Sequence, residues 1–267
     1  MKHNRLVLLI AAFLISSLTF AHEFWLEPIK FLLKQNEKVT IHMKVGEDYQ
    51  GDHSNGKKYN LTKLELYGNG KKKDIRGDVY GDSLSTVDLT IPAEGTQLVA
   101  FSNTSKFIEL EGPRFNNYLR SEGLDGVLRS RAQQGDTVKA GRELYQRCVK
   151  TLVQVGSKTD DTYSIDTGMR LEIIPGKNPY TANAAGSIKF KVRFDNKPLA
   201  NSLVLAWHMV DGTTTHTKLR SDKNGEVTFP IAKIGKWMIS TVHMIPTPDA
   251  KQADWQSFWG SYTFGYY

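Results

Sequence analysis

Apolar and polar residues alternate with a period of two over much of the chain, which is the pattern of β-strands that bury one face. In the segment 39–45 (VTIHMKV) the odd-numbered residues are apolar and the even-numbered residues are polar. The segment 61–67 alternates in the same way if one irregular step is allowed. Further strands are expected at 85–91, 97–103, 107–111, 170–174, 187–194, 202–210, 226–230 and 236–245. The pattern predicts a mainly β protein with antiparallel sheets.

Residues 113–155 have a different character, because they are rich in Arg, Leu and Gln. The segment 116–122 ends at Gly123, which is typical of a helix C-terminus, and 124–134 and 139–148 are also helical in composition. The sequence therefore predicts two antiparallel β-sandwich domains of immunoglobulin-like or transthyretin-like type, joined by a short helical segment. The expected boundaries are 22–112 for the first sandwich, 113–155 for the connecting segment and 163–267 for the second sandwich.

The first 21 residues have the pattern of a secretory signal peptide. Lys2 and Arg5 precede an apolar run at 6–18, and Thr19 and Ala21 place small residues before a cleavage site. No later run reaches the ~20 apolar residues that a membrane-spanning helix needs. We therefore expect cleavage after Ala21, release into the periplasm and no stable membrane insertion.

Charge and cysteine content exclude several functions. Cleavage removes two basic residues, so the net charge falls from +7 to +5, which is thinly spread and does not favour nucleic-acid binding. The single cysteine, Cys148, allows no intramolecular disulfide, and with no histidine near it in sequence it is expected to be a structural thiol. No hydrolase, P-loop, dinucleotide-binding or redox motif is present, so we do not expect an enzyme.

Cleavage after Ala21 has a chemical consequence at the new first residue, His22. Its free α-amine and its imidazole have reference pKa values near ~8 and ~6.5, so both become neutral donors at modest cost. Together they can chelate one transition metal ion, of the nickel, cobalt, copper or zinc class. The alternative is that His22 is an arbitrary residue behind a peptidase site.

The mature chain contains five other histidines with less distinctive settings. His243 shares the apolar face of strand 236–245 with Trp237 and Ile239, where a satisfied core histidine is the alternative to a ligand. His208 also lies on an apolar strand face, and His42 lies on a polar one. His53 falls in a polar loop, for which a solvated loop is expected and an oxygen-rich cation site is the alternative, and His216 falls in a turn-like threonine run expected at the surface.

Motifs along the mature chain resemble a known family. The sequences AHEFWLEP (21–28), YLRSEGLDG (118–126), GRELYQRCVKTLVQVG (141–156), RLEIIP (170–175), GKWMISTVHMIP (235–246) and DWQSFWGSYTF (254–264) resemble the family catalogued as domain of unknown function 4198. Exported proteins associated with nickel and cobalt uptake occur in it. The turns NKPLANS (196–202) and SDKNGEVTF (221–229) also resemble transthyretin-like or carboxypeptidase-regulatory sandwiches.

The resemblance implies roles for a few residues. His22 matches the first mature histidine of the family and His243 the histidine of its VHM motif, which implies that both are metal ligands. Arg142, Tyr145 and Lys150 match a recurring motif to which the resemblance gives no role. Asp254, Trp255 and Trp259 match a motif that is expected to be structural.

These observations predict a periplasmic metal-binding accessory protein. It is expected to bind one nickel or cobalt ion, with copper or zinc as alternatives, and to deliver it to a membrane uptake transporter or an outer-membrane receptor. The alternative is a recognition module without metal that presents Trp25, Trp255 and Trp259 to an envelope partner. A copper enzyme using the same histidine chelate is a third hypothesis, for which the sequence shows no substrate channel.

Overall fold

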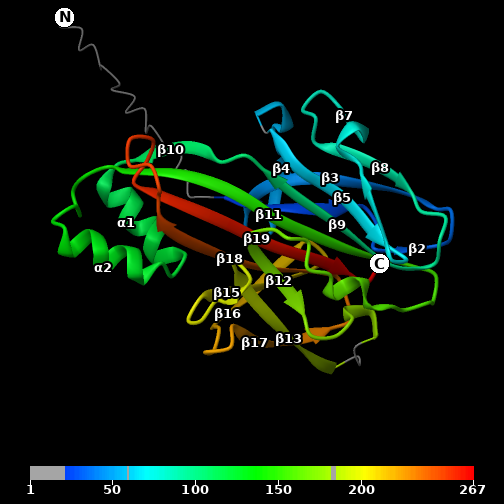
Figure 1. The fold of residues 1–267 in the computed structure, drawn as a ribbon. Helices are drawn as coiled ribbons and strands as arrows, with labels where there is room; N and C mark the ends of the chain where they lie inside the picture. Colours follow the sequence, from blue (N-terminus) through cyan, green and yellow to red (C-terminus); the bar gives the residue numbers. More distant parts are fainter. Residues whose placement is uncertain (1–21, 59, 182–184) are drawn as a thin grey trace, which may run out of the picture.

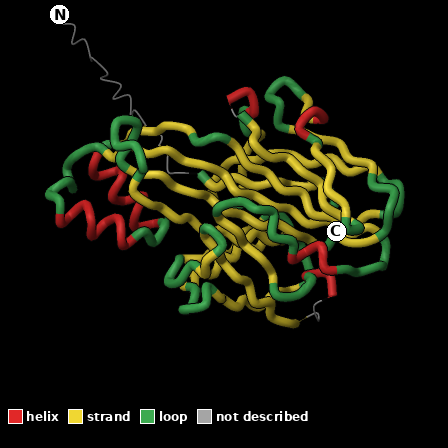
Figure 2. Tube along the Cα trace, viewed as in Figure 1, coloured by secondary structure: helices red, strands yellow, loops and turns green. Residues whose placement is uncertain are grey.

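The computed structural model describes residues 22–58, 60–181 and 185–267. The expected signal peptide lies outside these residues. Strands dominate the described chain, and two short helices lie together at one end (Figure 2). The predicted class, a mainly β protein with antiparallel sheets, is therefore confirmed. No helix in the described part of the chain is long and apolar enough to cross a membrane.

The strands form three sheets, named A, B and C here. Sheet A contains β1 (Glu23–Pro28), β3 (Lys38–Glu47), β8 (Thr86–Thr90) and β7 (Val79–Tyr80), with β4 (Gln50–His53) paired to β3. Sheet B runs in the order β16 (Thr213–Arg220), β15 (Leu203–Val210), β18 (Lys236–Pro246), β19 (Trp255–Gly265), β11 (Gly141–Val155), β9 (Gly95–Asn103), β5 (Leu61–Gly68) and β6 (Lys71–Asp74), with β10 (Lys106–Leu110) and β2 (Leu32–Leu33) also paired to β11. Sheet C contains β12 (Leu171–Pro175), β13 (Ala185–Phe194), β14 (Lys197–Pro198) and β17 (Glu226–Ala232).

Sheet B is the central layer, because its strands contribute to a core on each face. Along β11, Cys148 and Leu152 belong to the cluster that includes the apolar residues of sheet C, whereas Val149 and Val153 belong to the cluster shared with sheet A. Alternate side chains of a strand point to opposite faces, so sheets A and C cover opposite faces of sheet B. The order of layers is therefore A, B, C.

The helices α1 (Gly112–Ser121) and α2 (Asp125–Gln133) pack against one end of sheet B. Figure 1 shows them beside the ends of β11, β18 and β19, away from the C-terminus. Gly123 has a φ of +65° and follows α1, as its predicted helix-ending role requires. Four single turns of 3-10 helix complete the structure at η1 (Gly56–Lys58), η2 (Arg76–Asp78), η3 (Asp161–Ser164) and η4 (Pro179–Thr181).

Two local predictions are wrong. The segment 139–148, helical in composition, forms the first part of β11, which runs antiparallel to β10 and β9 and parallel to β19. The threonine run, expected to be a turn, forms β16 and pairs with all of β15. In both cases tertiary pairing outweighs the local preference.

One sheet of the structure contains strands from both of the expected sandwich domains. Sheet B takes β5, β6 and β9 from the expected first domain and β15, β16, β18 and β19 from the expected second. The boundaries at 112 and 163 therefore do not separate the sheets. The number of domains and the transthyretin-like character of the C-terminal part stay predictions.

Candidate metal centre

The β1–β3 pairing fixes the position of His22. Glu23 is opposite Gly46, so His22 comes beside Glu47, where β3 ends. Asp48 and Tyr49 both have positive φ, of 52° and 58°, as in the tight two-residue turns that join hairpin strands. This turn returns the chain into β4 directly after Glu47.

Burial of Tyr49 holds that turn in place. Its ring is inaccessible to solvent, meets Trp25 edge-on at 5.3 Å between ring centroids, and its hydroxyl donates to the Trp237 carbonyl at 3.3 Å. Positive φ is unfavourable for an aromatic residue, so these contacts offset the strain. The anchored ring fixes the end of the hairpin, and with it Glu47.

The His22 imidazole faces the Glu47 carboxylate. The distance from His22 Nδ1 to Glu47 Oε1 is 3.2 Å, although the side chains are 39% and 50% exposed. The Nδ1 atom itself is buried, and no group in the described chain meets it in hydrogen-bond geometry. A buried ring nitrogen without a bonded partner is unusual and calls for a ligand or a water molecule.

These atoms fit a transition metal ion. The α-amine of a first residue and its own Nδ1 close a six-membered ring on one ion, and a carboxylate oxygen is a common additional ligand. Two ligands of one such ion, each ~2.0–2.2 Å from it, are about 3 Å apart. The spacing between Nδ1 and Oε1 agrees with this value. No group of three or more His, Cys, Asp or Glu side chains suited to a metal occurs among the described residues, so the α-amine is essential to the fit.

Arg147 of β11 hydrogen-bonds the backbone of His22. Its Nη1 donates to the His22 carbonyl at 3.1 Å, and its guanidinium lies 5.5 Å from the Phe24 ring centroid and 5.1 Å from that of Trp259. Arginine favours such stacked positions because its planar cation packs on aromatic faces. The clamp fixes the backbone of His22 but leaves its imidazole directed at Glu47.

Two carboxyl groups with raised pKa values line a small pocket behind this site. Burial is the main cause that raises the pKa of Glu23 to about 7, and Arg147 opposes the rise. Burial also raises the pKa of Glu122 to about 8, with the charge of Glu23 adding to it. Both residues line the pocket together with Trp259. These carboxyls therefore exchange protons near neutral pH.

His243 lies on the other face of sheet B. It pairs with Phe258, whose side chain belongs to the core shared with sheet C, and its ring lies 4.3 Å from the Phe194 ring between centroids. Burial lowers its pKa to about 4, which Asp195 opposes. The predicted apolar face is confirmed, but His22 lies on the side of sheet A. The structure therefore does not bring His22 and His243 into one site, because the sheet separates them.

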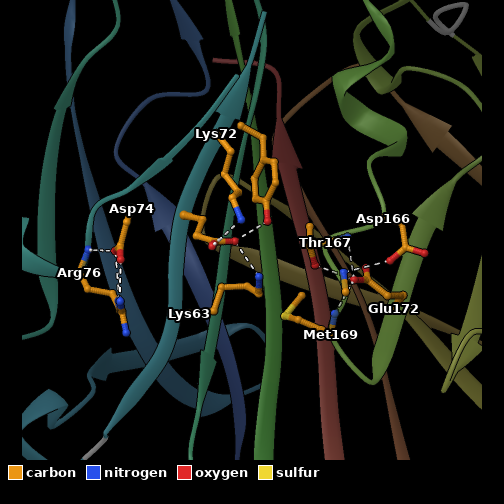
Figure 3. Close-up of polar contacts among 11 residues, drawn as sticks. Lys63, Lys72, Asp74, Arg76, Asp166, Thr167, Met169 and Glu172 are labelled. Carbon is orange, nitrogen blue, oxygen red and sulfur yellow. Dashed lines mark hydrogen bonds and ion pairs between the residues drawn. The ribbon is translucent and has the colours of Figure 1, made fainter. Parts of the chain in front are cut away.

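The remaining motif residues make structural contacts. Arg142 forms an ion pair with Asp254 at 2.6 Å between Nη2 and Oδ1. Lys150 is buried and its ammonium bonds Glu172. Glu172 also accepts from the Thr167 hydroxyl and from the Met169 backbone N–H (Figure 3). This buried ion pair, with the bonds that Glu172 accepts from Thr167 and Met169, fixes the 167–172 segment against β11.

Cys148 fits the structural role that its sequence setting suggests. It is buried, and burial raises the pKa of its thiol to about 12. A thiol that stays protonated at neutral pH is unreactive as a nucleophile.

Sequence reasoning missed Glu47. It lies 25 positions after His22, at the end of a segment whose continuation, 48–56, looks like a polar loop. The signal that could have found it is antiparallel pairing between 23–28 and 39–45, both of which alternate or are apolar. That pairing alone aligns His22 with the end of the second of these strands.

Together, the fold and the site define a mainly β protein in which the His22 imidazole meets the Glu47 carboxylate at the end of a hairpin. The model of a domain of unknown function (DUF4198) matches residues 19–245. The chain belongs to this family. No curated protein matches the chain.

Proposed function

We propose that this protein is an exported transition-metal-binding accessory protein whose site is His22 and Glu47. The observation that carries the proposal is the buried, unbonded Nδ1 atom of His22, 3.2 Å from a carboxylate oxygen of Glu47. Cleavage after Ala21 adds the α-amine as a third donor. The set of two nitrogens and one oxygen suits nickel, cobalt, copper or zinc.

The surroundings support reversible binding. Arg147 holds the His22 carbonyl, so the chelating residue is ordered before the ion arrives and less entropy is lost on binding. Both ligand side chains are partly exposed, which leaves coordination positions open to water or to a donor from another protein. Such a site suits an accessory protein that passes nickel or cobalt to a membrane uptake transporter or an outer-membrane receptor.

Titration of the processed protein tests the proposal. Mass analysis first establishes that His22 is residue one, and nickel and cobalt are then titrated by calorimetry. We expect one strong equivalent and a rise in the free energy of unfolding of ~2.7 kcal/mol at a free metal concentration one hundred times Kd.

Two variants and one control make this test specific. His22→Ala, or one extra residue placed before His22, should abolish the strong equivalent, because either change removes the chelate. His243→Gln is the matched control and should retain it. An unchanged strong equivalent in the extended protein would refute the site.

The alternative function, an envelope recognition module, depends on exposed aromatic residues. Trp25, Trp255 and Trp259 are 0%, 6% and 6% exposed and pack in the interior. The burial of these three tryptophans weakens the alternative, and we favour the metal-binding function.

A further inference from the structure

A second pair of donors lies on the outer part of sheet A. The rings of His42 and His53 are 4.4 Å apart between centroids and tilted by 60°. His53 is opposite Lys44 in the β3–β4 pairing, so His42, two residues earlier, is its diagonal neighbour on the same face. Among the described residues, neither ring forms an ion pair or a hydrogen bond to a backbone group that would explain why two imidazoles are placed together here.

Two hydroxyl groups lie beside the Nδ1 atoms of these rings, which leaves the Nε2 atoms as the candidate metal donors. His42 Nδ1 is 3.2 Å from Thr86 Oγ1, and His53 Nδ1 is 3.3 Å from Ser85 Oγ. A neutral imidazole that donates from Nδ1 carries its lone pair on Nε2. Metal-binding histidines are typically oriented by such a bond from the other ring nitrogen. In the described part of the chain, no protein group bonds either Nε2 atom.

The neighbouring charges bear on which ion the pair accepts. Burial lowers the pKa of His42, with further lowering by His53 and Lys44 and opposition from Glu27 and Asp88, which favours the neutral form of the ring that a metal requires. The Lys44 ammonium is engaged by the Gly51 carbonyl at 3.0 Å. Its positive charge still disfavours a cation, so only an ion with high affinity for imidazole overcomes it. Copper(II) has the highest affinity among the divalent ions of this series.

We propose that His42 and His53 form a second metal site, in which the two Nε2 atoms bind copper(II) and water completes the coordination. The site is distinct from the His22–Glu47 site. Glu47 lies five residues further along β3 than His42, a separation of ~17 Å in an extended strand, and its side chain points to the other face. The inference does not depend on the proposed function, because it uses neither His22 nor the α-amine.

Copper titration of a His22→Ala protein isolates the second site. We expect one equivalent of copper(II) in this background, with electron paramagnetic resonance showing nitrogen coupling from two imidazoles. His42→Gln or His53→Gln, each added to His22→Ala, should weaken binding about tenfold or more. Glutamine keeps a polar side chain of similar size, and circular dichroism establishes that each variant is folded.

A third histidine provides the control. His216 lies on the exposed strand β16, and its ring centroid is 4.9 Å from that of Trp207. It therefore contacts an indole ring where His42 contacts a second imidazole. His22→Ala/His216→Gln should bind copper as His22→Ala does. Absence of binding by His22→Ala, or equal binding by its His42→Gln and His53→Gln derivatives, would overturn the second site. Failure of the His22 site instead leaves wild type and His22→Ala with the same single equivalent, so the two failures are distinguishable.

Discussion

The two histidines that the sequence marks as ligands, His22 and His243, lie in contrasting surroundings on opposite sides of sheet B. His22 lies at the end of a hairpin, with a ring nitrogen facing a carboxylate. His243 packs against Phe194, and burial lowers its pKa to about 4. Of the two, only His22 has a second potential donor, the Glu47 carboxylate, beside its ring. The comparison shows that adjacent donors, more than the histidine itself, define a candidate metal site.

The largest effect expected from this comparison is a pH dependence of the free energy of unfolding that arises from His243. Its pKa in the folded protein is about 4, below the ~6.5 of the unfolded chain, so the unfolded state binds more protons between these values. The stabilising contribution is complete above pH ~6.5 and is lost as the pH falls towards 4. The full loss is on the order of 3 kcal/mol.

Urea unfolding at several pH values measures this contribution. His243→Gln should show a shallower loss of unfolding free energy between pH 6.5 and 4 than the wild type does. His22→Ala serves as the control and should keep the wild-type slope. Parallel curves for wild type and His243→Gln would show that the imidazole is not held neutral in the fold.

The next effect concerns the carboxylate that distinguishes the His22 surroundings. Glu47→Gln keeps the side-chain size but removes the charge and one good oxygen ligand, so nickel binding should weaken about tenfold, or ~1.4 kcal/mol. Calorimetry of the processed protein measures the change. Glu109→Gln, on the exposed face of β10, removes the same charge away from the site and should leave the affinity unchanged. Equal affinities for Glu47→Gln and wild type would remove Glu47 from the site.

The smallest effect tests the neighbour of His243. Asp195 opposes the lowering of the His243 pKa and forms a two-bond ion pair with Arg170 at 2.6 and 2.7 Å. Asp195→Asn should lower the pKa of His243 further, and it should cost less than ~1 kcal/mol because the ion pair is exposed. Asparagine tolerates the positive φ of 47° at this position, so the turn is retained. An NMR titration of the His243 ring follows the midpoint, and a rise would contradict the expected sign.

Much of the fold is predictable from period-two alternation. The irregular step expected in 61–67 is present as a break in register between Leu61 and Lys63. The apolar face of His243 is also as predicted. The first part of β11 was not predictable, because its strand character comes from pairing with β10, which lies before the two helices, and with β19, which lies more than 100 residues further along the chain. The composition of residues 139–148 does not show which distant strands they pair with.

The candidate site is predictable only in part, for a related reason. His22 follows from the expected cleavage site, which is a local pattern. Glu47 depends on a turn at Asp48 and Tyr49, and an aromatic residue at positive φ is not a usual turn signal. The separation of His22 from His243 depends on which face of sheet B sheet A covers. Alternation shows that two faces exist but does not identify the element that covers each one.

The position of β19 has a consequence for the order of folding. This strand, residues Trp255–Gly265, lies between β18 and β11, and its Ser261 and Thr263 hydroxyls bond the carbonyls of Phe24 and Leu26 in β1. Until residues 255–265 are present, β11 therefore cannot be joined to β18 through β19, and β1, although paired with β3, cannot bond sheet B through these two hydroxyls. Contacts of such long sequence separation make folding slow. Sheet B can therefore be completed only after β19 has been synthesised, when nearly all of its other strands are already present.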